Sequence, residues 1–77
     1  MLNVTKSKEV MWKTLIDEAK EREKVMIWFG EVRIEIQRED KALRFFLVEE
    51  DEKKEISSTE AKEIFIKNEV LGWAFSS

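Results

Sequence analysis

The order of apolar and polar residues along the chain predicts two amphipathic helices and an antiparallel sheet. Between residues 7 and 24 the apolar side chains recur every three or four positions, the period of a helix with one buried face. From residue 25 to residue 48 the period falls to two, as in strands that bury one face. The first five residues also alternate, so they are a candidate for a short first strand.

The two alternating segments, residues 25–37 and 43–48, are each predicted to form a strand, and the two strands to pair as a hairpin. A turn centred on Glu39 and Asp40 aligns the apolar positions of both strands on one face and their charged positions on the other. The predicted cross-strand pairs are Val32–Leu47, Ile34–Phe45, Glu35–Arg44 and Ile36–Leu43.

A second turn at Asp51 and Glu52 is predicted to lead into a short third strand. This turn sets Glu50 opposite Lys53 and brings opposite charges together across the hairpin. Neither turn contains Gly or Asn, which tight two-residue turns favour, so four-residue turns are expected.

The last twenty residues predict a second helix and a final strand. Ser57 and Glu60 have the spacing of a capping box, and Asn68 is a candidate for a left-handed residue that ends the helix. From Val70 to Phe75 large and small residues alternate, which predicts a strand with its bulky side chains in the core.

Together these elements predict a single compact α+β domain over residues 1–77. We expect a two-layer sandwich, in which an antiparallel meander sheet of three to five strands packs against two helices in the order (β)αββ(β)αβ. That order permits a ferredoxin-like βαββαβ arrangement if the first strand forms. The chain has no proline, two glycines and no repeat, so no linker is expected, and no stretch matches the motif of a known family.

Composition removes most catalytic chemistry. The chain has no His and no Cys, so it lacks imidazole and thiol groups for catalysis, disulfides or zinc sites. The acidic run at residues 49–52 lacks the spaced ligands and the glycine of an EF-hand loop. No enzymatic activity, metal or cofactor is therefore expected. Without cysteines, a signal peptide or a membrane-spanning run, a cytoplasmic location is the expectation.

The candidate partner-binding residues lie on the sheet face away from the predicted core. The run Val25–Phe29 is apolar on both faces of a strand, which one buried face does not explain. Aromatic and arginine side chains are typical of protein-binding surfaces. We therefore predict a small non-catalytic protein-binding module, acting on another protein or as a homodimer, through an exposed face formed by Phe29, Arg33, Arg44, Phe46 and Val48.

Two alternatives remain open. The final third of the chain, residues 49–77, holds eight acidic and four basic residues. In size and composition the chain is similar to the inhibitors that phages and mobile elements make against host nucleic-acid-binding proteins, including anti-defence, anti-CRISPR-like proteins. This likeness would make an acidic surface a substitute for phosphates. The other alternative is an RNA- or DNA-binding sheet that uses the same aromatic and arginine face. The acidic surface is Glu49, Glu50, Asp51 and Glu52.

Overall fold

The computed structural model describes the backbone of residues 4–76 and the side chains of residues 7–76. Its two helices and five-stranded antiparallel sheet confirm the predicted α+β class. The elements are α1 (Val4–Glu21), β1 (Lys24–Trp28), β2 (Val32–Glu39), β3 (Ala42–Glu49), β4 (Glu52–Ile56), α2 (Ser58–Lys67) and β5 (Gly72–Ser76).

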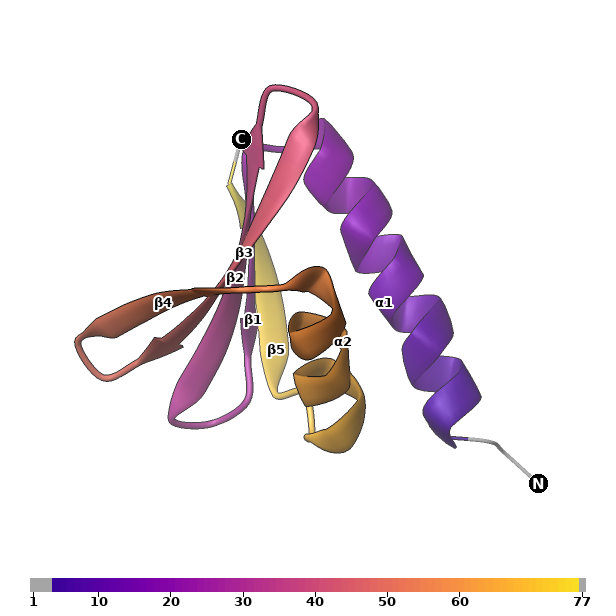
Figure 1. Ribbon diagram of the computed structural model, residues 1–77. Helices are drawn as coiled ribbons and strands as arrows, with labels where there is room; N and C mark the ends of the chain where they lie inside the picture. Colours follow the sequence, from indigo (N-terminus) through magenta and orange to yellow (C-terminus); the bar gives the residue numbers. More distant parts are fainter. Residues whose placement is uncertain (1–3, 77) are drawn as a thin grey trace.

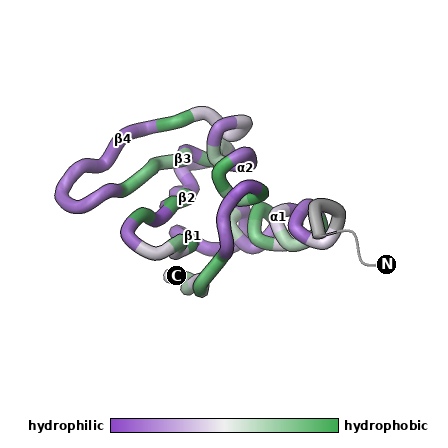
Figure 2. The backbone as a smooth tube through the Cα atoms, turned by 90° about the horizontal axis from the view of Figure 1, so that it is seen from below, coloured by the Kyte–Doolittle hydropathy of each residue, from purple (hydrophilic) through white to green (hydrophobic). Residues whose placement is uncertain are grey.

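The sheet has the strand order β4-β3-β2-β1-β5, with every neighbouring pair antiparallel. Strands β1 to β4 follow one another as a meander, and β5 returns to pair with β1. Both helices lie on one side of the sheet, and the opposite side has no helix over it (Figures 1 and 2). The β3–β4 hairpin turns strongly away from the direction of β1 and β5 (Figure 1), as expected from the twist of antiparallel ribbons. The side without helices is called the open face below.

The core lies between the helices and the sheet. Alternation directs Val25, Ile27, Ile34 and Ile36 toward the helices, and all four are fully buried. Phe65 from α2 is also fully buried and contacts Trp12 of α1, with ring centroids 5.2 Å apart. The helix side of the sheet therefore holds the main apolar cluster, as the alternating pattern predicts.

The hairpin register differs from the prediction by two residues. Ile36, rather than Ile34, lies opposite Phe45, and Arg44 faces Gln37 instead of Glu35. The cause is a two-residue turn at Asp40–Lys41, in which Asp40 takes a left-handed backbone with φ 57°. The expected four-residue turns are therefore wrong, because Asp tolerates that conformation. A shift of two residues keeps every side chain on its predicted face.

The register of the β3–β4 hairpin also differs from the prediction by two residues. Its two-residue turn is Glu50–Asp51, with Glu50 at φ 49°, so Glu49 faces Glu52. The third predicted strand is present as β4, but Lys53 lies opposite Val48 instead of Glu50.

The predicted single strand over residues 25–37 is in fact two strands, β1 and β2. Gly30 has φ +99° and lies in the turn between them, where a residue without Cβ is favoured. Phe29 N–H donates to the Val32 carbonyl at 2.9 Å and closes this turn. β1 lies between β2 and β5, with Val25 and Ile27 buried on the helix side, whereas Met26 and Trp28 are half-buried on the open face.

At the N-terminus, Val4 and Thr5 begin α1 instead of a strand, so the helix starts before residue 7, where the helical pattern begins. Residues 1–3 of the proposed first strand lie outside the described residues. The ferredoxin-like arrangement depends on that strand and stays a prediction.

Helix α2 begins as predicted at a capping box. The Ser57 hydroxyl accepts a hydrogen bond from Glu60 N–H at 3.1 Å. At the other end Asn68 has an extended backbone, φ −121°, so its predicted left-handed conformation is wrong. The Asn68 side chain instead donates to the Ile64 carbonyl at 2.9 Å. Lys8 of α1 donates to the Ile66 carbonyl at 3.1 Å, where its charge also suits the helix C-terminus.

Candidate functional site

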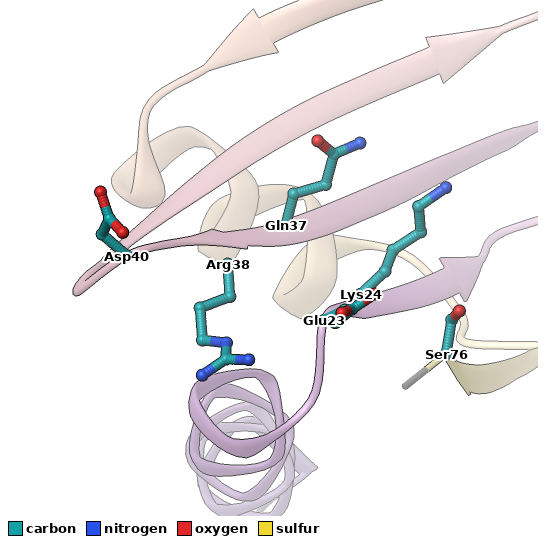
Figure 3. A pocket seen from close by; sticks show the side chains of 6 residues that line it. All are labelled: Glu23, Lys24, Gln37, Arg38, Asp40 and Ser76. Atoms are coloured by element: carbon teal, nitrogen blue, oxygen red, sulfur yellow. The ribbon is translucent and has the colours of Figure 1, made fainter.

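A pocket at one end of the sheet has few groups that could catalyse a reaction. Its volume is about 620 Å³, and Arg38 points toward α1 whereas Lys24 and Gln37 point to the opposite side (Figure 3). The hollow therefore wraps around the strand ends instead of enclosing a ligand. Two acidic and two basic groups line it, and its one hydroxyl, on Ser76, has no imidazole base in this chain. The lining residues are Glu23, Lys24, Gln37, Arg38, Asp40 and Ser76.

The open face is organised around a buried carboxylate. Glu35, in the middle of β2, is only 3 % exposed. Its Oε2 accepts from Arg33 Nε at 2.8 Å and lies 2.8 Å from the second guanidinium nitrogen. Its Oε1 lies 3.4 Å from the ammonium groups of both Lys24 and Lys53, although neither has hydrogen-bonding geometry. One carboxylate thus joins cations from β1, β2 and β4.

These cations decide the ionisation of Glu35. Burial raises the pKa of the carboxyl, but the Arg33 hydrogen bond and the charges of Lys24 and Lys53 together outweigh it and hold the pKa below its ordinary value. Glu35 is therefore a carboxylate at neutral pH. Because it neutralises part of this basic cluster, the open face attracts phosphate less than its arginine and lysine content alone implies.

The two apolar residues predicted for partner binding on this face, Phe46 and Val48, are both buried, and Phe46 lies beneath charged side chains. Phe46 is 9 % and Val48 is 8 % exposed. The Lys53 ammonium lies 4.6 Å from the Phe46 ring centroid and the Arg44 guanidinium 5.3 Å from it. Lys53 crosses over this ring on its way from β4 to Glu35 on β2. The aromatic surface is therefore closed by side chains of the domain itself.

Arg33 and Arg44 both lie on the open face but in separate ion clusters. Arg33 belongs to the Glu35 cluster, while Arg44 pairs with Glu39 at 2.9 Å and with Glu55 at 2.7 Å. The hydrogen bonds to Glu55 and Glu39 raise the pKa of Arg44, and the Arg44 bond lowers the pKa of Glu55. The two arginines do not form one continuous cationic patch.

The predicted placement of Phe29 on the open face is wrong. Its ring packs edge-on against Phe65 of α2, with centroids 6.2 Å apart, and belongs to the margin of the main core. The error follows from the single strand drawn through Gly30: once the chain turns there, the alternation that assigned Phe29 a face no longer applies.

The acidic residues occupy the tip of the β3–β4 hairpin, which extends away from the helices as a hydrophilic loop (Figure 2). Glu49, Glu50, Asp51 and Glu52 are all exposed, and none takes part in an ion pair found among the described side chains. The described residues contain no group of three or more carboxylates arranged to hold a metal ion.

The most apolar exposed surface is the edge strand β5. Trp73 lies opposite Ile27, and Phe75 lies opposite Val25, so both rings point to the helix side of the sheet. Nevertheless Trp73 is 47 % and Phe75 36 % exposed, and Leu71, just before the strand, is 64 % exposed. The expected burial of this bulky face is wrong because α1 packs against β1 and β2, and α2 packs against β3. We call Leu71, Trp73 and Phe75 the β5 edge.

The hydrogen bonds of β1 show which backbone N–H and C=O groups of β5 have no partner within the sheet. Arg38 N–H donates to the Glu23 carbonyl and Phe29 N–H to the Val32 carbonyl, so odd-numbered residues of β1 bond to β2. The even-numbered residues of β1 therefore form their backbone hydrogen bonds with β5. Their partners there are Gly72, Ala74 and Ser76, which are also even-numbered. The N–H and C=O groups of Trp73 and Phe75 consequently point outward, away from the sheet.

The sequence does contain a sign of the exposed β5 edge, which the alternation of large and small residues did not reveal. In a chain with 40 % charged residues, Val70–Ser76 carries no charge at all. Glu35 offered no such signal, since a charged residue between two isoleucines is typical of a solvated strand face.

No protein-family model, curated protein or solved structure matches this chain. In the part of the chain that the structure describes, neither helix is long and apolar enough to span a membrane. Function is therefore inferred from the surfaces of the domain itself.

Proposed function

We propose that this protein is a small non-catalytic protein-binding module that docks its partner along the β5 edge. The observation that carries this proposal is the exposure of Trp73 and Phe75 beside their own unpaired backbone groups. Such an edge can add a strand from another protein, since backbone hydrogen bonds supply affinity and side-chain contacts supply specificity. Aromatic side chains are also enriched among the residues that dominate binding energy.

The contrast between the two sheet edges supports this assignment. At the opposite edge, β4 carries the charged run Glu52–Glu55. Charged side chains on an edge strand discourage pairing with other chains. The β5 edge lacks this protection, and a contiguous exposed apolar surface on a small domain is typical of an interaction site.

The proposal replaces the open face as the main docking surface. Phe46 is covered by Lys53 and Arg44 and Val48 is buried, so a partner would first have to displace the cations above Phe46. At the β5 edge the Arg22 guanidinium lies 4.7 Å from the Phe75 ring centroid. Trp73 and Leu71 are nevertheless 47 % and 64 % exposed, so a partner reaches them directly and less of the interaction energy is lost on binding.

The test compares two lysine substitutions of exposed apolar residues. Trp73→Lys introduces a charge into the β5 edge, whereas Val10→Lys alters a residue of α1 that is 62 % exposed. Both variants are expected to remain folded by circular dichroism. Immobilised wild-type and Val10→Lys proteins should retain the same binding proteins from a cell extract, and Trp73→Lys should lose them. Equal retention by Trp73→Lys would contradict the proposal.

A second candidate is docking of the acidic hairpin tip on a basic protein surface. It is supported by the exposure of the four acidic residues and by the projection of the hairpin away from the helices (Figure 2). Four like charges at one tip create a local field suited to a nucleic-acid-binding site. Changing Glu49, Glu50, Asp51 and Glu52 to Gln or Asn should then abolish capture of basic proteins and leave Trp73-dependent capture intact. Basic proteins retained equally by this variant would exclude the candidate.

A further inference from the structure

We propose that the β5 edge pairs with the β5 edge of a second copy of this chain, which joins the two sheets into one continuous antiparallel sheet. The pairing rests on the proposed docking function of this edge and names its partner. A two-fold axis perpendicular to the sheet would relate the copies, so that all four helices lie on the same side.

The outward backbone groups select one register. Trp73 and Phe75 carry the unpaired N–H and C=O groups, so these residues must form the hydrogen-bonded pairs between copies. An axis through Ala74 achieves this, because each Trp73 then exchanges two hydrogen bonds with Phe75 of the second copy. An axis through Trp73 would require the Leu71 N–H, which already donates to the Trp28 carbonyl at 2.9 Å. An axis through Phe75 would carry the pairing past Ser76, where β5 ends.

The same register matches the side chains. On the helix side, Trp73 of each copy lies beside Phe75 of the other, an aromatic cross-strand pair. On the open face, Ala74 meets Ala74, and Gly72 meets Ser76, so no bulky group separates the strands. The strand carries no charge, and the overall net charge of −3 on each copy is small. Nothing in the strand itself opposes its own pairing.

The exposed area indicates a weak dimer. With Trp73 47 % and Phe75 36 % exposed, the two rings offer roughly 150 Å² of apolar surface per copy. With Leu71 and the strand backbone, the interface falls at the small end of specific contacts, for which a dissociation constant on the order of 10 μM is reasonable. The dimer should therefore form in a concentration-dependent manner.

Disulfide trapping tests the register directly, because the chain contains no cysteine. Across the proposed axis the two Ala74 Cα atoms would be about 4.5 Å apart, within the range a disulfide spans. Ala74→Cys should form a disulfide-linked dimer under mild oxidation. Val10→Cys, an exposed position on α1, is the matched control and should stay monomeric under the same conditions.

A mixed-cysteine experiment separates this register from its neighbours. Gly72→Cys and Ser76→Cys proteins should crosslink when mixed, and neither should crosslink efficiently alone. A Cβ at Gly72 meets no atom within 4 Å, so the first substitution is compatible with the fold. Efficient crosslinking of either variant with itself would contradict the proposed register.

Sedimentation velocity of the unmodified chain measures the association itself. Between about 1 and 500 μM the wild-type protein should pass from monomer to dimer, and Trp73→Lys should weaken the association by at least about tenfold. A wild-type protein that stays monomeric at the highest concentration, with no Ala74→Cys disulfide, would overturn the self-pairing. If Trp73-dependent capture of another protein persisted, the docking function would stand with a different partner; if that capture also failed, both proposals would be wrong.

Discussion

Replacement of Glu35 by Gln should lower the free energy of unfolding at pH 7 by about 2–4 kcal/mol. The substitution keeps the size of a side chain that is 4 % exposed but removes the charge shared by Arg33, Lys24 and Lys53. Removing one partner of a fully buried ion pair typically costs about 3–5 kcal/mol. The three cations are 36–44 % exposed, so solvent stabilises them partly after the loss.

The same carboxylate gives stability a defined pH dependence. The pKa of Glu35 in the folded protein lies below its ordinary value of 4.5, which the unfolded chain retains. The unfolded state therefore binds the proton first as the pH falls. The stabilisation from Glu35 is complete above about pH 4.5 and is lost as the pH falls through the lower, folded pKa.

Urea denaturation followed by circular dichroism, at pH values from neutral to about 2.5, measures both effects. The difference in stability between wild type and Glu35→Gln should be constant above the ordinary carboxyl pKa and should shrink below it. Glu55→Gln is the matched control: the pKa of Glu55 is also lowered by its arginine partner, but this pair is solvent-exposed. That variant should retain most of the acid sensitivity that Glu35 causes.

Two results would refute this reasoning. Equal stability of Glu35→Gln and wild type at pH 7 would mean that the surrounding cations contribute no net stabilisation. A difference that grows as the pH falls from 5 to 3 would mean that burial dominates and the pKa of Glu35 is raised.

Three further substitutions test the fold. Phe65→Ala should cost about 3–5 kcal/mol, enough to unfold most of the chain, because Phe65 of α2 is fully buried against Trp12 of α1 and Phe29; loss of the thermal transition would reveal it. Gly30→Ala should cost about 1–2 kcal/mol in urea denaturation, from its φ of +99° alone, since a Cβ there meets no atom within 4 Å. Ser57→Ala should lose about 1 kcal/mol with the N-cap hydrogen bond, whereas Ser58→Ala, within the first turn, should change stability by less than about half that amount; equal losses would contradict the cap assignment.

Local patterns predicted most elements of this fold because they depend on neighbours in sequence. The period of two assigned Ile34, Ile36 and Phe45 to the buried side of the sheet, and the structure has all three there. The capping box at Ser57 fixed the start of α2 through a contact that spans three residues. Such signals survive in the sequence because no distant residue is needed to create them.

The predictions were wrong where the structure depends on an unusual backbone conformation or on packing between residues far apart in sequence. The two-residue turn at Asp40 moved the hairpin register by two, and a left-handed residue without glycine or asparagine gives only a weak sequence signal. Gly30 stood out in the strand pattern, but an isolated glycine is equally typical of a bulge inside one strand and of a turn between two strands.

The candidate binding surfaces show most clearly what depends on the sequence alone and what depends on the tertiary structure. The sequence determined that the chain carries an acidic run, an alternating aromatic and basic face and an uncharged final strand. Only the tertiary structure decided which of these surfaces is accessible. Phe46 is covered because Lys53 reaches across it from β4 to Glu35, and Trp73 is exposed because the helices pack over other strands. Exposure depends on the placement of groups far apart in sequence, which a local pattern does not encode.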